Sequence, residues 1–566
     1  MLASFSLIDD GWIPSRPLEG GAVQHVGLRE VLTQAQAFER IDDPSPLVTV
    51  ALYRLCLAVL HRALRGPGDA AQVAEWYSGG FSQEAIHRYL DAHADRFDLF
   101  HETLPFMQVA DLTPELDGGK YLSHWTRLGT EVGSANTTAL FNPAGRPGGE
   151  RNDSISPAEA ARRLLEHQTF ALGGLIKRFT TSAKAAPIAT FALTLPQGRT
   201  LHETFCLNLV PYRPDGDAPA WEQPPLRAEA VRKLYEGSAD LSRVVMGLTD
   251  HYSWVSRSVR LTQVEEDGSV RVRFIGFAAG IPFKNTLEET GKTVDPMVAT
   301  VPGRDPKQPF PFPQKLRREQ LFWRDVLALL PEPQNQRQVL EGGQAAGQVV
   351  RVKGTPPASV YHAREVLRAL EEQGHSIGGS FDLDALEDAP TSRYAYAQPV
   401  IPVSVFGQVT DQGKAFSYRQ EGYTLPHAFV EEPQRFTDEV FTALEAAKHA
   451  GGGLKQAIRR LVVETLSRGG EREPHKDDVN KLMDQLPAEA TFWARLEAPF
   501  RQYLAALDDS PPAAAREWRR TLTRTAWDAW TLACQGVGEG AAALRAASIA
   551  KGILVSTLKP LNSGGD

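Results

Sequence analysis

The sequence predicts an α+β protein in which a large mixed N-terminal domain, residues 1–430, precedes a C-terminal antiparallel four-helix bundle, residues 431–566. Three observations lead to this fold class. The chain has 566 residues, which is too long for one ordinary hydrophobic core. Helical and period-two segments alternate in its first part, whereas only helical patterns remain after Glu431.

The first hundred residues are expected to be mainly helical, with helices over 28–37, 46–65 and 83–95. The second of these segments is the most apolar, but it contains Arg54 and Arg62. We therefore interpret it as a buried helix with its N-cap at Ser45, and not as a membrane span.

Period-two patterns predict strands over 186–210 and 259–277. The second stretch contains Asp267 and Gly268, a residue pair that favours a tight hairpin turn. A further strand pair is predicted on either side of Asp411, Gln412 and Gly413, which would form its turn.

A helix start is signalled at Ser156. Pro157 suits the first helical position, and Glu159 completes a capping box with the serine. The helix is expected to end near Leu172, before two glycines.

Those two glycines, Gly173 and Gly174, suit a left-handed helix cap and also leave backbone that another backbone could approach closely. Lys177 and Arg178 follow at once. Bare backbone flanked by two cations suits contact with a phosphate chain. A simple helix C-cap with solvated cations explains the same residues, so both interpretations stay open.

The C-terminal part is predicted to hold four helices over 437–467, 476–507, 513–534 and 541–558, the first interrupted by the glycines at 451–453. Long helices with short links favour an antiparallel bundle.

The third of these helices has two distinct faces. Its apolar face carries Trp518, Leu522, Ala526, Ala529 and Ala533. Its opposite face carries Arg516, Arg520 and Arg524, without an acidic residue in the stripe. Such a stripe could follow a phosphate backbone, although it is also typical of a solvated helix face.

Composition narrows the functional classes. The net charge of −8 argues against a freestanding, strongly basic nucleic-acid binder, unless positive charge is local or partner subunits supply it. Cys56, Cys206 and Cys534 lie far apart, which predicts neither a disulfide framework nor a zinc site. The first residues lack the basic and apolar regions of a signal peptide, so we expect a cytoplasmic protein.

The enzyme motifs HExxH and GxGxxG are absent from the sequence. Gly291, Lys292 and Thr293 look like the end of a phosphate-binding loop, but Thr286 stands where that loop needs glycine. We therefore predict no enzymatic activity and no cofactor. A hydrolase with a site of dispersed residues is the least favoured alternative.

Five segments in order resemble the CasA family, the large subunit of the type I-E CRISPR Cascade complex. They are LIDDGWIP, SPLVTVALYRLCLAVL, LPFMQ, ANTTALFN and the glycine pair after HQTFAL. The resemblance covers most of the chain. It implies a non-catalytic subunit that reads the protospacer-adjacent motif on duplex DNA. It also implies other Cascade subunits, a guide RNA and a separate helicase-nuclease as partners, and no membrane.

The resemblance implies three sets of site residues. An RNA-contacting loop, facing the 5′ handle of the guide, corresponds to Leu140, Phe141 and Asn142. A glycine loop against the motif's minor groove corresponds to Ala171, Leu172, Gly173 and Gly174. A wedge that enters between base pairs corresponds to Gln412, between Asp411 and Gly413.

Two departures from the family matter. The family's minor-groove lysine has Lys284 only as its nearest counterpart. Some relatives bind zinc through cysteine pairs, but segments 143–155 and 265–269 contain no cysteine, so no metal is predicted. The arginines of the C-terminal part would lie near target DNA or the small subunits. A structural adaptor without direct DNA readout is the alternative function.

Overall fold

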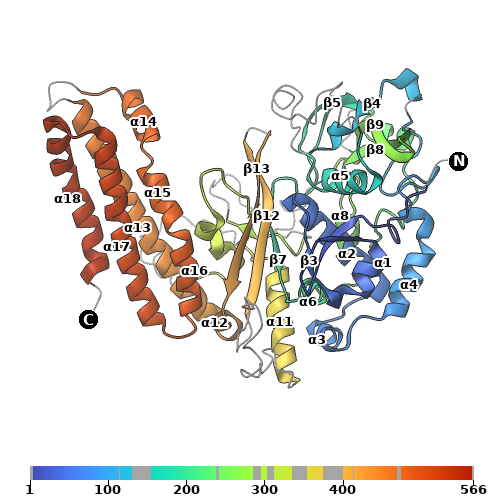
Figure 1. The fold of residues 1–566 in the computed structure, drawn as a ribbon, viewed down its shortest axis with the longest axis horizontal. Helices are drawn as coiled ribbons and strands as arrows, with labels where there is room; N and C mark the ends of the chain where they lie inside the picture. Colours follow the sequence, from blue (N-terminus) through green and yellow to red (C-terminus); the bar gives the residue numbers. More distant parts are fainter. Residues whose placement is uncertain are drawn as a thin grey trace. The chain divides into compact units, whose positions relative to one another are not determined.

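The computed structural model describes residues 4–113, 115–129, 154–237, 241–284, 295–302, 311–333, 354–373, 400–411, 414–467 and 473–563. The chain divides into two compact units (Figure 1). The first unit comprises residues 1–318 with 349–422, and the second comprises 319–348 with 423–566. Each unit is described by itself.

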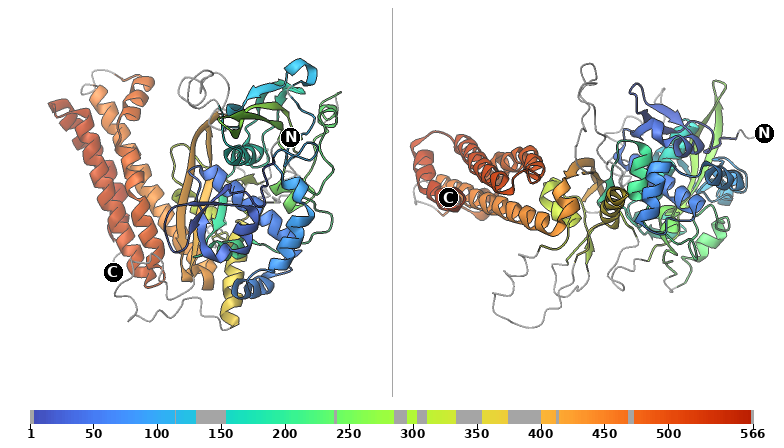
Figure 2. Two further views of the ribbon diagram at one scale, coloured as in Figure 1. Left: turned by 45° about the vertical axis from the view of Figure 1, so that its right-hand side comes forward. Right: turned by 90° about the horizontal axis from the view of Figure 1, so that it is seen from below.

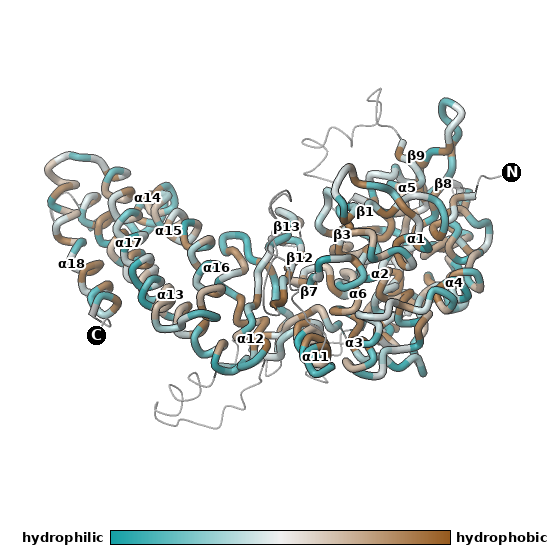
Figure 3. Tube along the Cα trace, turned by 60° about the horizontal axis from the view of Figure 1, so that its bottom comes forward, coloured by the Kyte–Doolittle hydropathy of each residue, from teal (hydrophilic) through white to brown (hydrophobic). Residues whose placement is uncertain are grey.

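The core of the first unit is built around helix α2 (Pro46–Leu64). Its N-cap is Ser45, whose side chain accepts a hydrogen bond from the Val48 amide. The helix is apolar along most of its length (Figure 3). Its most apolar window is 83% buried inside the structure, as expected of a core helix. The prediction of a buried helix is confirmed.

Further helices of this unit are α1 (Leu28–Thr33), α3 (Ala70–Gly79), α4 (Gln83–Ala92), α5 (Pro157–Phe170), α6 (Leu201–Asn208), α7 (Ala228–Lys233), α8 (Leu248–Tyr252) and α11 (Ala358–Glu372). Helices α4, α5 and α8 pack against α2. Helices α3, α7, α8 and α11 were not predicted from the sequence.

Three strands form a sheet in the order β4-β9-β8. Strands β8 (Arg257–Glu266) and β9 (Ser269–Ala279) pair antiparallel, and β4 (Leu122–His124) joins β9. Asp267 and Gly268 connect β8 to β9 with φ angles of 51° and 72°. These left-handed values are those that an Asp-Gly hairpin turn requires, so the predicted hairpin is confirmed.

A second sheet has the order β13-β12-β7, with β7 at Leu193–Pro196, β12 at Ile401–Asp411 and β13 at Lys414–Leu425. Strand β7 pairs antiparallel with β12. The predicted strand pair on either side of residues 412 and 413 is therefore confirmed, while those two residues lie outside the described part of the chain. Smaller strand pairs are β1 (Ile13–Pro17) with β2 (Gln24–Val26) and β3 (Phe38–Ile41), β5 (Gly174–Arg178) with β6 (Thr180–Ala183), and β10 (Thr300–Val301) with β11 (Phe312–Pro313).

The prediction of strand throughout 186–210 is wrong in its second half, where α6 forms. The Thr200 side chain accepts a hydrogen bond from the Glu203 amide at 3.1 Å. The Glu203 carboxylate accepts one from the Arg199 amide at 2.6 Å. This pairing of threonine with a glutamate three residues later starts a helix locally and overrides the alternating pattern.

In the second unit all described elements from residue 433 onward are helices. The longest are α13 (Pro433–Leu466), α17 (Pro511–Val537) and α18 (Ala541–Ser563). They pack on one another, and Figures 1 and 2 show them side by side. The predicted helix over 476–507 is instead three helices, α14 (Lys476–Gln485), α15 (Ala488–Arg495) and α16 (Glu497–Ala506). The first break comes at Leu486, whose extended backbone is typical of a residue before proline.

Helix α13 continues through its three glycines, so the predicted interruption is wrong. A Cβ atom on Gly451 would lie 2.4 Å from the Trp493 ring, and one on Gly453 would lie 2.2 Å from the Thr557 methyl group. Gly452 faces open space. Two of the glycines therefore allow α15 and α18 to approach α13 closely, and they do not break the helix.

These contacts predict opposite effects for neighbouring substitutions. Gly453→Ala should lower the free energy of unfolding by about 1–3 kcal/mol, because its new methyl group overlaps Thr557. Gly452→Ala should raise it by about 0.5–1 kcal/mol, because alanine is the better helix former. Chemical denaturation of the two variants checks this, and equal shifts would contradict the packing role of Gly453.

Buried histidines make stability depend on pH. Burial lowers the pKa of His61, His251 and His362 to about 4. Since their pKa values in the unfolded chain are about 6.5, the unfolded chain takes up protons first as pH falls. Stability is therefore lost from about pH 6.5 downward.

By about pH 5.5 each of these histidines should remove about 1.4 kcal/mol of unfolding free energy. Thermal midpoints measured from about pH 8 down to that value at constant ionic strength check this. His362→Gln should flatten the profile, because it removes one of the buried histidines. A profile that does not depend on His362 would contradict the assignment.

Candidate nucleic-acid interface

Helix α5 leads into the predicted glycine loop. The Ser156 side chain accepts a hydrogen bond from the Glu159 amide at 3.2 Å, which confirms the predicted start. The helix ends at Phe170, two residues before the predicted end. Ala171 follows with φ −54° and ψ 121°, so the left-handed glycine cap predicted here is wrong.

The last carbonyl groups of α5 and of the residues after it are bonded by donors from other elements. The Ser256 hydroxyl donates to the Gln168 carbonyl at 2.6 Å. The Gln408 amide donates to the Phe170 carbonyl at 2.9 Å, and the Arg257 guanidinium donates to the Leu172 carbonyl at 2.6 Å. The Ala186 amide donates to the Ala171 carbonyl at 2.8 Å. Tertiary contacts thus replace the glycine cap.

The glycine loop opens the hairpin of β5 and β6. A Cβ atom on Gly173 would lie 3.1 Å from the Ala185 amide nitrogen, so the chain's own backbone already occupies one side of this glycine. A Cβ atom on Gly174 would have no neighbour within 4 Å, and both glycines are exposed. Of the two, Gly174 is the one that leaves open backbone for a ligand.

Arg178 fastens the turn of this hairpin to the neighbouring sheet, beside which Figure 1 shows β5. Its guanidinium donates to the carbonyl oxygens of Tyr121, Leu122 and Phe277 at 3.0, 3.0 and 3.2 Å. Lys177 is exposed, in a left-handed conformation with φ 58°. The two cations predicted beside the glycines thus differ, since one holds the hairpin and the other faces solvent.

A groove of about 450 Å³ lies against the hairpin and is lined by Lys120, Tyr121, Lys177, Arg178, Phe179, Thr180, Thr181 and Arg232. Its four cations come from three separate parts of the chain. Lys120 and Arg232 lie 3.1 and 3.6 Å from the same carboxylate, that of Asp117. No acidic residue is among the lining residues, and Asp117 only partly offsets the four cations, so the groove is net positive.

More positive charge lies beneath the hairpin. Arg257 is 3% exposed and donates to the carbonyl oxygens of Leu172, Lys184 and Ser256. Burial lowers its pKa to about 10 and also lowers the pKa values of Arg127 and Arg178. Within the described ranges none of the three has a carboxylate partner. Their charge is therefore poorly neutralised, and it favours an anion at the surface above.

Lys284 is exposed and follows β9. Its amide donates to the Arg243 carbonyl at 2.9 Å. The adjacent Ser242 hydroxyl lies 2.5 Å from the Nζ atom of Lys184, directly after β6. The structure therefore brings Lys284 to the segment that the end of the hairpin also contacts.

Two sets of predicted residues lie outside the described part of the chain. They are the RNA-contacting residues Leu140, Phe141 and Asn142, and the wedge residues Gln412 and Gly413. Strand β12 ends at Asp411, which was predicted to belong to the turn, and β13 begins at Lys414.

The arginines of α17 have the predicted exposure, while the opposite face of the helix, with Trp518 and Leu522, is buried. The prediction of a stripe without acid is wrong, because Glu517 lies 3.7 Å from Arg520. Arg516 and Arg524 have no ion-pair partner among the residues that the structure describes.

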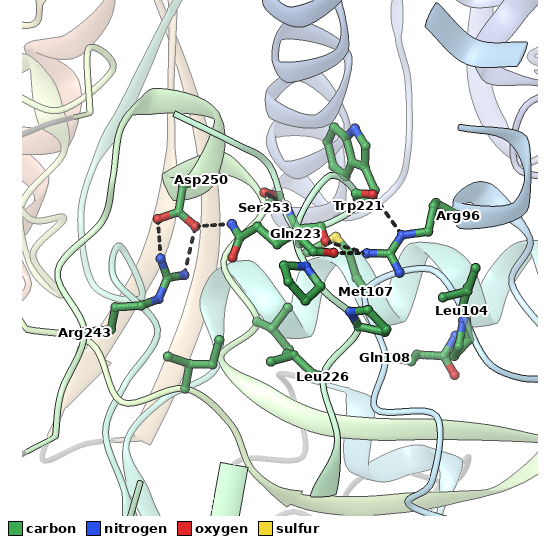
Figure 4. A pocket seen from close by; sticks show the side chains of 16 residues that line it. Arg96, Leu104, Met107, Gln108, Trp221, Gln223, Leu226, Arg243, Asp250 and Ser253 are labelled. Atoms are coloured by element: carbon green, nitrogen blue, oxygen red, sulfur yellow. Dashed lines mark hydrogen bonds and ion pairs between the residues drawn. The ribbon is translucent and has the colours of Figure 1, made fainter. Parts of the chain in front are cut away.

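A separate cavity of about 40 Å³ in the first unit has the appearance of an internal polar network (Figure 4). Both terminal nitrogens of Arg243 donate to Asp250 at 2.8 Å, and Gln223 donates to Asp250 at 2.9 Å. Arg96 donates to the Trp221 carbonyl at 2.8 Å. The charged groups of the cavity already form hydrogen bonds with one another or with backbone carbonyls, and its volume suits a few water molecules. We therefore do not propose it as a ligand-binding or catalytic site.

Sequence reasoning missed several residues of this region. Lys120 and Arg232 gave no signal because they are distant from the glycines in sequence. For Gln408 the sequence did contain a signal, because a lone amide inside the apolar run 401–409 must find hydrogen-bond partners when it is buried. Arg257 likewise begins a buried strand.

The comparisons with known proteins agree with one another. The family model for CRISPR-associated protein Cse1 matches residues 6–529. The CRISPR-associated protein CasA/Cse1 of Thermus thermophilus is 38% identical over 550 residues, which is 96% of this chain and 95% of the relative.

Solved structures show the same fold. The crystal structure of CasA from Thermus thermophilus matches with a TM-score of 0.79 and 34% identity, covering 99% of this chain and 100% of that one. A chain of a CRISPR RNA-guided surveillance complex matches with a TM-score of 0.66 and 18% identity, covering 97% and 99%. With the family model matched along most of its length, the chain belongs to the CRISPR-associated protein Cse1 family.

Proposed function

We propose that this chain is the non-catalytic large subunit of an RNA-guided antiviral surveillance complex, type I-E Cascade. It recognises the protospacer-adjacent motif in duplex DNA, wedges the strands apart to start R-loop formation and helps recruit the helicase-nuclease. The observation that carries the proposal is the open backbone at Gly174 beside a groove of four cations. Membership of the Cse1 family and the likeness to a surveillance-complex chain support it.

The glycine loop suits the minor groove of DNA. That groove is only about 6 Å wide, so exposed backbone enters it where larger side chains would not. The cations of the adjacent groove, Lys120, Lys177 and Arg232, would then contact phosphates and hold the duplex in register. Lys284, near the end of the hairpin, is the proposed minor-groove lysine.

The wedge acts at the next step. Gln412, joining two long strands, would enter between base pairs, and backbone contacts on both sides would offset the unstacking cost of a few kcal/mol. Pairing between guide and target then reads the sequence, while the protein reads only the short motif. Leu140, Phe141 and Asn142 would contact the 5′ handle of the guide RNA.

The proposal also gives the C-terminal helices a role in the complex. Residues 431–566 would act as an antiparallel four-helix bundle, with α14, α15 and α16 together as one member, next to a domain of residues 1–430. Arg516 and Arg524 on α17 would face target DNA or the small subunits. We place the complex in the cytoplasm.

Binding experiments test the proposed motif recognition. A guide-RNA complex reconstituted with and without this chain is titrated with matched duplexes that carry or lack the motif. The chain should tighten binding only to the motif-bearing duplex. Gln412→Ala should keep assembly and motif binding but lose strand opening. If the chain changes binding to neither duplex, the structural-adaptor alternative takes the place of this proposal.

The cations of the groove predict an effect on the salt dependence of DNA binding. Lys120→Ala, Lys177→Ala and Arg232→Ala should each weaken binding to the motif-bearing duplex and reduce the slope of log affinity against log salt by about 1. Arg88→Ala, which removes an exposed cation on α4, is the matched control and should leave the slope unchanged. Weaker binding with an unchanged salt slope would mean that these cations do not contact phosphates.

A further inference from the structure

Gln408 makes a contact that the proposed function does not yet use. It lies on β12, the strand that leads to the wedge, and it is 1% exposed. Its side-chain Nε2 donates to the Phe170 carbonyl at 2.9 Å and to the Ala189 carbonyl at 2.5 Å. One amide nitrogen therefore joins the wedge strand to the last residue of α5.

The orientation of this amide is fixed by chemistry. Both neighbours are carbonyl oxygens, so only the NH₂ group can face them, and a flipped amide would place three oxygen atoms together. The Gln408 Oε1 atom is buried and has no hydrogen-bond partner among the described residues. The side chain is thus held through its two donated bonds, and an apolar residue would bury at lower cost.

The strand approaches the rest of the unit closely at this point. A Cβ atom on the adjacent Gly407 would lie 2.9 Å from the Phe191 carbonyl oxygen. Phe191 and Ala189 belong to the segment whose Ala186 amide bonds the Ala171 carbonyl. Gln408 therefore fastens β12 to the end of α5 and to the segment packed beneath the glycine loop.

The contact sits between the two proposed DNA-binding elements. Phe170 immediately precedes Ala171, the first residue of the glycine loop. Gln408 stands three residues before Asp411, the last residue of β12, which in extended strand corresponds to about 10 Å. The hydrogen bonds of Gln408 thus fix the position of β12 relative to the residue that precedes the glycine loop.

We propose that Gln408 is a positioning residue that sets the spacing between the glycine loop and the wedge. Motif binding at the loop then places the Gln412 side chain in register with the first base pair to be opened. Arg257 holds the other side of the loop through the Leu172 and Lys184 carbonyls. The loop therefore stays in place when the contact at Gln408 is lost, whereas the strand that carries the wedge is no longer bonded to the end of α5. This inference rests on the proposed function.

The test uses the complete guide-RNA complex reconstituted with Gln408→Met, which keeps the side chain's length and removes both donors. Gln420→Met is the matched control, because Gln420 is an exposed amide on the paired strand β13 whose contact with β12, to the Ser404 hydroxyl at 3.5 Å, is long for a hydrogen bond. A 2-aminopurine base beside the motif reports strand opening by fluorescence. A second target, already unpaired beside the motif, removes the need for the wedge.

Gln408→Met should slow opening of the intact duplex about tenfold, the order expected from losing such hydrogen bonds. On the unpaired target it should match the unsubstituted complex, and motif-dependent binding should be retained. In a chain that already carries Gln412→Ala it should cause no further loss, because it acts through the wedge. Gln420→Met should behave as the unsubstituted chain does.

Three results would overturn the inference. They are an unchanged opening rate, a defect that persists on the unpaired target, and additive losses with Gln412→Ala. If Gln408→Met does not assemble, Gln408→Asn, which keeps the amide on a shorter side chain, undergoes the same measurements with the same criteria. Failure of the unsubstituted chain to open motif-bearing duplex would instead refute the proposed function, so the two failures are distinguishable.

Discussion

The arrangement of the candidate interface depends on the carbonyl groups at the end of α5. Any helix leaves its last carbonyls without partners inside the helix, and burying them without donors is costly. Here the donors are Ser256, Arg257 and Gln408, which come from the start of β8 and from β12. Because the acceptors flank the glycine loop, satisfying them also fixes the loop against two sheets. One requirement of helix termination thus determines where open backbone appears on the surface.

Electrostatics follows from the same arrangement. The chain carries a net charge of −8, yet Arg127, Arg178 and Arg257 gather at one hairpin without carboxylate partners in the described segments. Two of them bond to backbone carbonyls, which hold a guanidinium in place but do not cancel its charge. Local positive potential can therefore coexist with an acidic chain, and composition alone misjudges such a surface.

Local signals in the sequence were reliable where the structure is determined locally. The cap at Ser156 and the Asp267-Gly268 turn depend on residues within a few positions, and both are present. Predictions were wrong where contacts with residues distant in the sequence determine the local structure. The glycine at 173 has the Ala185 backbone packed closely against it, and Gly453 is required by Thr557, so neither acts as the helix breaker that its type suggests. The glycine loop was predicted from sequence, whereas the groove that completes the candidate site unites residues far apart in the chain.

Opening a duplex places a mechanical demand on the protein that simple binding does not. Unstacking one base step costs a few kcal/mol, and a wedge that yields under that load would move away from the bases. A buried amide with an unpartnered acceptor, as at Gln408, costs stability compared with a well-packed apolar side chain. It offers in return a directional contact that an apolar residue lacks, since two hydrogen bonds resist sliding of the strand past α5. The stiffness needed at the proposed wedge would then originate at a buried contact four residues away, next to the loop proposed to bind the motif.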